Sequence, residues 1–377
     1  MSRKKIVIMT VGLGGGHKAM ARNLVHVLGR VDDDLDVKVI DVIADGWPSF
    51  NTATTKAYAG STTSATSWLF RLYYVLSDRF PRPIQWFANL AFARYARRKY
   101  AEERPDMIIA TFPFLAEVAA RARDYHRGKM PIILTITDAG RVQGIWLCKA
   151  ADMTLTATED TVPYLIERGL DPSKVRYIGF PAADVFYESI NQKQVRRSLG
   201  LRPDLMTILL TAGGAGLNPQ KVLAVAQSIS TLRVPYQLIL NAGSNDDLKA
   251  GFEAMTFPYA EHVIIEGFTD KMPDYMRASD IICSKSGWLT INEALVMQRM
   301  LVLYDAVPGH EEQNVEYVVG NHFGIFEPVP HKIAGHIREF MQSPELFQQY
   351  AERMRAARTN QNPYDELAAL FHSYLLK

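Results

Sequence analysis

The sequence lacks the features that mark several special classes of protein. Its two cysteines, Cys148 and Cys283, have no histidine or further cysteine nearby, which excludes a disulfide framework and gives no sign of a zinc site. No apolar run approaches the roughly 18 residues that a membrane-spanning helix needs. The 42 lysines and arginines are nearly balanced by 40 acidic residues, so we expect no overall attraction to nucleic acid. These absences are typical of a globular protein in a reducing compartment, and we expect a cytoplasmic location.

The N-terminus imitates a signal peptide. Basic residues at positions 3–5 precede an apolar run over residues 6–13, and residues 19–21 resemble a cleavage site. Residues 14–18 separate these two parts. The apolar run is better explained as a first β-strand.

A chain of 377 residues is too long for one compact core, and two domains are the simplest interpretation. Short apolar runs alternate with longer amphipathic stretches, which is typical of an α/β fold with parallel sheets. We predict an N-terminal domain over residues 1–185, a C-terminal domain over 186–345, and helices over 346–377, for which packing back on the N-terminal domain is one arrangement. The predicted strands are 5–11, 36–42, 107–111, 131–136, 152–156, 175–178, 206–211, 236–241, 262–265, 280–283, 301–304 and 324–326.

The two halves of the chain open alike. Residues 6–19 read IVIMTVGLGGGHKA and residues 207–220 read TILLTAGGAGLNPQ. Each is an apolar strand followed by a glycine-rich turn and the start of a helix. We therefore predict two Rossmann-like domains that face each other across a cleft.

Residues 66–100 stand out by composition. They contain ten aromatic and seven basic residues against a single acidic residue, Asp78. We interpret them as a basic, aromatic and helical insertion in the N-terminal domain. The alternative is that many of the rings are core residues and the arginines are merely solvated.

The first glycine-rich turn, from Gly12 to His17, has more than one chemical interpretation. Its amides could face an anion or let a ligand approach the backbone closely. A dinucleotide fingerprint would need glycine where His17 stands, although Asp41 occupies the place of a ribose-binding acid, and a tight turn without ligand is a further alternative. The positive end of the helix disfavours protonated imidazole, which leaves His17 in the neutral form that a general base requires.

Three segments should meet at the ligand-binding edge of the C-terminal sheet. The second glycine-rich turn puts bare amides at a helix start, which suits a diphosphate. The carboxylate of Glu293 could accept hydrogen bonds from both hydroxyls of a ribose. Side chains after the strand at 301–304 could bind sugar hydroxyls, with a helix cap as the alternative. The residues of this predicted site are Gly213, Gly214, Gly216, Ser284, Lys285, Ser286, Gly287, Glu293, Glu312, Gln313 and Asn314. No metal-binding constellation emerges.

Taken together, these segments resemble the family 28 glycosyltransferases of the GT-B fold, particularly the branch of monogalactosyldiacylglycerol synthases and processive diacylglycerol glucosyltransferases. The resemblance runs over most of the chain, and the ordered set of motifs is more specific than any single one. The matching segments are 14–19, Asp41, 104–106, 111–113, 137–138, Trp146, 179–181, 213–216, 267–269, 284–293 and 308–314.

The resemblance implies a role for each part of the chain. The C-terminal domain would hold a UDP-sugar, with Phe268 and Thr269 at the base and Glu293 at the ribose. The glycines of the second turn would bind the diphosphate, and Glu312, Gln313 and Asn314 the sugar. The N-terminal domain would receive a lipid acceptor. The residues implied there are His17 and Asp138 near the transferring centre, with Gly14, Gly15, Gly16 and Trp146 on the acceptor side.

We therefore expect an inverting glycosyltransferase that uses no metal ion or other cofactor. A lipid hydroxyl would attack the anomeric carbon of a UDP-hexose, with His17 as general base and Asp138 as a competing base or orienting partner, and UDP would leave. The alternatives are a nucleotide-sugar epimerase or hydrolase of similar fold and a non-catalytic UDP-sugar-binding membrane protein.

The resemblance also gives the insertion at 66–100 a role. Apolar rings flanked by arginines suit the interface of an anionic membrane, so we expect peripheral membrane association. Two positions depart from the family pattern. Relatives tend to have a histidine shortly before the tryptophan at 146, which is absent here, and Trp288 stands in a turn that is usually rich in glycine or proline.

Overall fold

The structure is a computed structural model that describes residues 3–12, 15–47, 67–214, 216, 218–309, 311–357 and 362–376, with side chains at 67–71 and 73 left out. The chain divides into two compact units. The first comprises Met1–Pro181 together with Asn362–Lys377, and the second comprises Ala182–Gln361.

The first unit is built on a parallel six-stranded sheet with the order β2-β1-β3-β4-β5-β6. In the register of this sheet, Ile8 of β1 pairs with Val39 of β2 on one side and with Ile109 of β3 on the other. The direction of strand succession therefore reverses between β1 and β3. The strands are β1 (Lys5–Thr10), β2 (Asp36–Asp41), β3 (Met107–Ala110), β4 (Ile132–Thr135), β5 (Met153–Thr156) and β6 (Val175–Tyr177).

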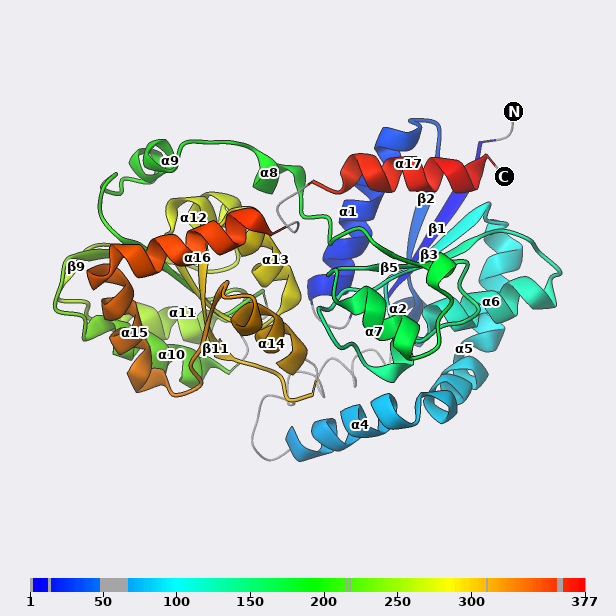
Figure 1. Cartoon of the computed structure of the whole chain (residues 1–377), viewed down its shortest axis with the longest axis horizontal. Helices are drawn as coiled ribbons and strands as arrows, with labels where there is room; N and C mark the ends of the chain where they lie inside the picture. Colours follow the sequence, from blue (N-terminus) through cyan, green and yellow to red (C-terminus); the bar gives the residue numbers. More distant parts are fainter. Residues whose placement is uncertain are drawn as a thin grey trace. The chain divides into compact units, whose positions relative to one another are not determined.

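Helices cover the first sheet, and the last helix of the chain lies beside the first one (Figure 1). Helix α1 buries Met20, Leu24, Val27 and Leu28, whose spacing of three and four residues puts them on one face. The helices are α1 (Gly15–Val31), α2 (Val42–Gly46), α4 (Ser67–Arg79), α5 (Pro81–Glu103), α6 (Leu115–Tyr125), η1 (Gly144–Trp146), α7 (Thr161–Glu167), η2 (Pro172–Lys174) and α17 (Tyr364–Leu375).

The second unit also contains a parallel six-stranded sheet, with the order β12-β11-β10-β7-β8-β9. From β7 the strands follow one another through β8 to β9 in one direction, and from β10 they follow through β11 to β12 in the other. The switch point therefore lies between β7 and β10, as in doubly wound folds. The strands are β7 (Thr207–Thr211), β8 (Tyr236–Asn241), β9 (Ala260–Glu266), β10 (Ile281–Lys285), β11 (Met300–Asp305) and β12 (Gly324–Phe326). The helices are α8 (Asp184–Tyr187), α9 (Gln192–Ser198), α10 (Pro219–Ser230), α11 (Asp246–Glu253), α12 (Met272–Ala278), α13 (Trp288–Val296), α14 (Glu312–Gly320), α15 (Pro330–Gln342) and α16 (Pro344–Ala356).

Each strand predicted from the sequence is confirmed, and differences are confined to strand ends, such as β9, which begins at Ala260. The prediction of helix in the insertion at 66–100 is confirmed by α4 and α5. The C-terminal helices divide between the units, because α16 remains in the second unit and α17 belongs to the first.

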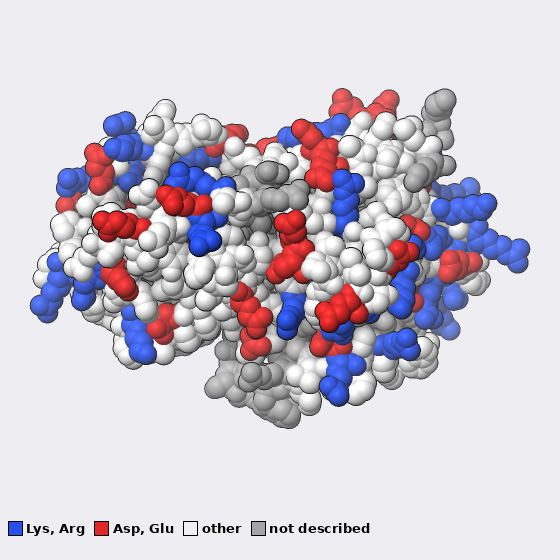
Figure 2. Space-filling view, in the orientation of Figure 1, with Lys and Arg blue, Asp and Glu red and all other residues white. Residues whose placement is uncertain are grey.

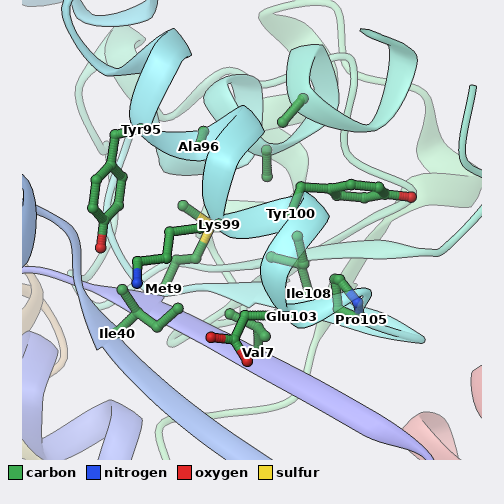
Figure 3. Close-up of a pocket in the computed structure, with 12 residues that line it drawn as sticks. Val7, Met9, Ile40, Tyr95, Ala96, Lys99, Tyr100, Glu103, Pro105 and Ile108 are labelled. Atoms are coloured by element: carbon green, nitrogen blue, oxygen red, sulfur yellow. The ribbon is translucent and has the colours of Figure 1, made fainter. Parts of the chain in front are cut away.

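Helix α5 is tied to the sheet of the first unit at its carboxyl end. The buried carboxylate of Glu103 accepts hydrogen bonds from Lys38, at 2.5 Å, and from Lys5, at 2.9 Å. The bonds from Lys38 and Lys5 lower the pKa of Glu103. Figure 3 shows the underside of the helix, where Tyr95 and Lys99 lie over the strands beside an apolar cavity of about 20 Å³, room for one water molecule.

Two further observations bear on the predictions from composition. Cys148 and Cys283 are free and buried, and burial raises the pKa of each thiol to about 12, so both are chemically inert. In the part of the chain that the structure describes, no helix combines the length and apolar character needed to cross a membrane.

Candidate active site

His17 lies at the switch point of the first sheet, where the strand order reverses. It is the third residue of α1, which follows β1, and its buried ring meets the segment that follows β3. Its Nδ1 atom lies 2.7 Å from the carbonyl oxygen of Thr111 and 3.2 Å from the hydroxyl of Thr137. Open α/β sheets bind ligands at such switch points, so the fold places His17 where chemistry is expected.

The partner of Nδ1 determines the tautomer of His17. A carbonyl oxygen can only accept a hydrogen bond, so Nδ1 carries the proton that is donated to Thr111. In the neutral ring the lone pair then belongs to Nε2. The imidazole is further enclosed by Phe112, at 4.9 Å between ring centroids, and by Trp146, at 6.4 Å. This arrangement fixes the ring and makes Nε2 its basic atom.

The structure brings some of the predicted acceptor-side residues together. Trp146 is buried against His17, while Asp138 is half-buried and follows Thr137 directly. Gly15 and Gly16 open α1, and a Cβ atom at either would meet open space. Gly14 lies outside the described residues.

Asp41, the residue considered for a ribose, caps a helix. Its Oδ1 accepts a hydrogen bond from the amide of Ala44, at 3.0 Å, at the start of α2. Its other oxygen lies 3.8 Å from the ammonium of Lys18. Asp41 thus has the partners of an ordinary N-cap.

The second glycine-rich turn follows β7 at the switch point of the second sheet. Gly213 and Gly216 both have positive φ angles, of 74° and 58°. At Gly216 a Cβ atom would lie 2.6 Å from the carbonyl oxygen of Ala242, so a side chain there would force this turn away from the loop after β8. The amide of Ser244 donates to the carbonyl of Gly214 at 3.0 Å and holds the turn in place.

Lys285, at the end of β10, lies beside this turn. Its Cε would be 3.7 Å from a Cβ atom at Gly213, and its ammonium forms an ion pair with Glu311. The second oxygen of Glu311 accepts a hydrogen bond from the amide of Val307 at 3.0 Å. An ion pair between a half-buried ammonium and a buried carboxylate therefore lies beside the glycine turn at the switch point. In this turn the amide of Gly213 donates to the hydroxyl of Thr211 at 3.2 Å, and the amide of Gly216 donates to the carbonyl of Gly213 at 3.1 Å.

The turn between β10 and α13 is held from the side by α14. The buried amide of Asn314 donates to the carbonyl of Ser286 at 3.0 Å, and Gln313 donates to the carbonyl of Gly309 at 3.2 Å. Glu312, the first residue of α14, is exposed. The structure thus gives Asn314 a buried backbone partner within the site.

The remaining predicted residues take separate positions around this turn. Ser284 and Ser286 are buried, Gly287 precedes α13 as its N-cap, and Glu293 is half-buried within α13. On the loop after β9, Phe268 is 79% exposed, and the hydroxyl of Thr269 accepts a hydrogen bond from the amide of Lys271 at 3.1 Å.

Several contributors to the two sites take roles that the sequence did not predict, although Thr111, Thr137 and Glu311 lie within the matching segments. Thr111 and Thr137 hold His17, and Glu311 holds Lys285. Asp305, at the end of β11, accepts hydrogen bonds from Lys221 at 2.6 Å and from Asn218 at 3.0 Å. Their common signal is a polar residue at or beyond the carboxyl end of a parallel strand. Over the residues placed by the structure, no three histidine, cysteine or acidic side chains gather as a metal site would need.

Two Rossmann-like units, each with a parallel six-stranded sheet and a switch point, define the fold class as GT-B. Solved structures share this fold over nearly the whole chain. MurG from Acinetobacter baumannii has a TM-score of 0.66 at 13% identity and covers 98% of this chain and 99% of its own. CalG4, the calicheamicin glycosyltransferase, has a TM-score of 0.62 at 14% identity and covers 100% and 99%. A UDP-GlcNAc 2-epimerase from Neisseria meningitidis has a TM-score of 0.58 at 13% identity and covers 99% of each chain. At these identities the likeness shows the fold alone.

Sequence comparison places the chain within that class. Residues 17–182 match the family model of monogalactosyldiacylglycerol synthase, and residues 207–364 match the C-terminal domain of glycosyltransferase family 28. The chain belongs to the family 28 glycosyltransferases, in the branch that includes these synthases.

Two relatives illustrate the branch. A probable chloroplastic monogalactosyldiacylglycerol synthase from Glycine max is 29% identical over 367 residues, which are 94% of this chain and 69% of the relative. A processive diacylglycerol beta-glucosyltransferase from Staphylococcus saprophyticus is 26% identical over 376 residues, which are 98% of this chain and 94% of the relative.

Proposed function

We propose that the protein transfers a hexose from a UDP-sugar to the hydroxyl of a diacylglycerol-type lipid, with inversion at the anomeric carbon. The observation that carries this proposal is the buried imidazole of His17, whose Nδ1 donates to the Thr111 carbonyl and whose Nε2 is thereby the basic atom. The names of the two relatives support a diacylglycerol-type acceptor.

In the proposed reaction, His17 acts on the acceptor. Its Nε2 takes the proton of the lipid hydroxyl while the hydroxyl oxygen attacks the anomeric carbon. The bond between that carbon and the diphosphate oxygen breaks, and UDP leaves with the bonding electron pair. We propose Asp138 as orienting partner or competing base, and Gly15, Gly16 and Trp146 as the walls of the acceptor site.

The second unit would stabilise the leaving UDP. We propose that the turn at Gly213, Gly214 and Gly216 and the N-terminus of α13 at Gly287 bind the diphosphate beside the ammonium of Lys285. In the structure the amide of Gly213 donates to the hydroxyl of Thr211 at 3.2 Å and the amide of Gly216 donates to the carbonyl of Gly213 at 3.1 Å, so the amide of Gly214 is the donor that we propose within the turn. These groups supply positive charge of the kind that a metal ion supplies elsewhere. We therefore propose a metal-independent reaction.

The other donor contacts follow the family resemblance. We propose that exposed Phe268 and Thr269 take the base, Glu293 the ribose, and Glu312 and Gln313 the sugar. Asn314, Ser284 and Ser286 are buried, and we propose that they support these donor contacts from inside the second unit. The epimerase alternative rests on a fold shared at 13% identity, whereas both family models are those of glycosyltransferases, so transfer is favoured.

The paired helices α4 and α5 are the proposed contact with an anionic membrane. Their solvent-exposed apolar residues include Leu76 on α4, Phe80 between the helices, and Trp86 and Phe87 on α5. Figure 2 shows lysine and arginine side chains gathered around α6 and the carboxyl end of α5. Apolar side chains beside cations are the composition that binds peripheral proteins to anionic lipid.

The direct test is a transfer assay with UDP-glucose or UDP-galactose and diacylglycerol vesicles. We expect release of UDP together with a glycolipid, unchanged in the presence of EDTA. His17→Gln should lower kcat by about 100-fold or more, because a general base contributes about 10²–10⁴-fold. UDP should still raise the melting temperature of this variant, since UDP is expected to contact the other unit.

The matched control is His262→Gln, at an exposed histidine of β9, which should keep full activity. Release of free hexose or an isomerised UDP-sugar without glycolipid would contradict the proposal. Full turnover by His17→Gln would remove His17 from the role of base.

A further inference from the structure

Helices α4 and α5, which we propose as the membrane contact, are joined by hydrogen bonds to another segment of the first unit. These bonds lie near the turn between the two helices. Asp78, one residue before the end of α4, accepts a hydrogen bond from the amide of Gly144 at 2.9 Å. The same carboxylate oxygen accepts from Arg168 at 3.1 Å, and the backbone carbonyl of Asp78 accepts from Arg168 at 3.2 Å. Arg168 is itself held by the hydroxyl of Tyr164 at 2.6 Å. Asp78 thus connects α4 to the start of η1 and to the end of α7.

Helix α5, which follows the turn, forms hydrogen bonds with the same segment. Gln85, in the first turns of α5, donates its side-chain amide to the carbonyl of Ile145 at 3.3 Å and to that of Leu147 at 3.2 Å. Gly144 approaches so closely that a Cβ atom there would lie 2.4 Å from the carbonyl oxygen of Asp78. The two helices therefore hold η1 by hydrogen bonds at both of its ends, and this close approach depends on a glycine.

The clamped segment carries Trp146, which packs on the proposed base. Trp146 is 2% exposed, and its ring centroid is 6.4 Å from that of His17. It also belongs to the core of the first unit, so it cannot move independently of the backbone that bears it. A shift of η1 would therefore move the ring of Trp146 relative to the imidazole of His17.

We propose that Asp78 and Gln85 are positioning residues for catalysis: they fix the turn Gly144–Leu147 and thereby hold Trp146 against His17. Neither residue touches the reacting atoms. They act through Trp146. Their hydrogen bonds also fix the positions of α4 and α5 relative to the proposed general base. The inference rests on the proposed function, because it assumes that His17 is the base.

The test uses the full chain with diacylglycerol vesicles and the UDP-sugar that it accepts. Asp78→Ala removes the carboxylate oxygen that accepts from Gly144 and Arg168 but keeps the backbone carbonyl that also accepts from Arg168. It should lower kcat at least ten-fold while the KM for the UDP-sugar and the melting-temperature shift caused by UDP stay unchanged. Asp78→Asn keeps an oxygen for the Gly144 amide and should restore kcat to within about three-fold of wild type. Vesicle binding of both variants should equal that of wild type.

A matched control separates this effect from the removal of an ordinary ion pair. Glu366→Gln removes the carboxylate of the Arg176–Glu366 pair, which lies in the same unit with similar exposure, and should leave kcat unchanged. Gly144→Ala should lower kcat as Asp78→Ala does, and the double variant should be no worse than either single one, since all three disturb one interaction. Should Asp78→Ala fold poorly, Gln85→Met, which removes the two donated bonds at constant length, takes its place.

The outcomes distinguish the two proposals. An active wild type with equally active Asp78→Ala and Gln85→Met would overturn this inference and leave the proposed function standing. A decrease in kcat that Asp78→Asn does not recover, or that comes with an equal decrease in UDP binding, would also overturn it. A wild type that transfers sugar to no lipid would overturn the proposed function, and this inference with it.

Discussion

The ammonium of Lys285 illustrates how a single residue can serve two partners. In the structure it pairs with the buried carboxylate of Glu311, beside the glycine turn after β7. A buried carboxylate needs a counter-charge, and the half-buried ammonium of Lys285 supplies one. In the proposed reaction the diphosphate of the donor would bring further negative charge to the same ammonium.

This leads to a prediction for Lys285→Met. The change keeps much of the apolar stem but removes the charge, and with it a charge-assisted hydrogen bond to the donor. The KM for the UDP-sugar should therefore rise by roughly 10- to 100-fold. The melting-temperature shift at a fixed UDP concentration should shrink accordingly. Steady-state kinetics and a thermal-shift titration measure the two effects.

Glu311→Gln is the informative comparison. It removes the same ion pair but keeps the ammonium, so donor binding should survive if Lys285 binds the diphosphate. If Glu311→Gln weakened UDP binding as strongly as Lys285→Met, the ion pair would matter only as a structural support.

For single residues, the sequence identifies candidates for the site but does not show which groups they contact in the fold. His17 is recognisable because it opens a helix after an apolar strand and a glycine-rich turn. Its contact with Thr111 spans 94 residues and arises because β1 and β3 are neighbours in the sheet. That adjacency follows from the order of the strands, which local pattern does not encode.

Helix α5 has two distinct faces. One face is buried against the sheet and carries Phe92, Tyr95 and Ala96. The other face is exposed to solvent and carries Trp86, Phe87 and Leu90, whose exposed fractions are 53%, 64% and 66%. Large exposed apolar side chains grouped on one helix usually mark an interaction surface. The ring of Trp86 also packs edge-on against Phe87, at 4.9 Å between centroids.

We therefore expect the double variant Trp86→Ser and Phe87→Ser to bind vesicles of anionic phospholipid at least ten-fold more weakly. Burying such a ring contributes about 1.5–3 kcal/mol, and a part of this for two rings suffices for the effect. Co-sedimentation with vesicles measures the binding. The melting temperature should not fall, because neither side chain is part of the core.

An exposed aromatic residue elsewhere provides the control. Tyr259→Ser, in the second unit, removes a ring that is 47% exposed and should leave vesicle binding unchanged. Equal binding by the double variant would refute the assignment of α4 and α5 as the membrane contact.

The elements themselves follow well from the sequence. Strands such as β7 and β10 are short apolar runs bounded by glycine or polar residues, so their burial dictates their pattern. The faces of α5 are less predictable, because aromatic residues occur on both of them. Composition alone could not say that Phe92 is core while Phe87 faces solvent.

At the scale of the whole molecule, the first unit is completed by a distant segment. Helix α17 packs on α1 and buries Leu367 and Phe371. The guanidinium of Arg30 lies 4.4 Å from the ring centroid of Tyr364, and Arg176 forms an ion pair with Glu366 at 2.6 Å. The stability of the first unit therefore depends on a helix that follows the second unit in sequence.

Phe371→Ala should destabilise the first unit selectively. Truncation of a fully buried phenylalanine costs about 3–5 kcal/mol, and the cost falls on the unit that holds the side chain. Calorimetry with and without UDP would measure this. We expect the UDP-insensitive transition to move to lower temperature and the UDP-sensitive one to stay.

Leu376→Ala serves as the reference, since this side chain is 74% exposed just beyond α17 and should change neither transition. Equal displacement of both transitions by Phe371→Ala would show that the two units unfold as one.

The separation of α17 from the rest of its unit also sets an order of assembly on the ribosome. Residues 182–361 must be synthesised between the first unit's main body and its closing helix. At about 5–20 residues per second this takes roughly 10–40 s. During that interval the face of α1 that α17 will cover is open to chaperones, so the first unit is completed only after the second unit has been synthesised.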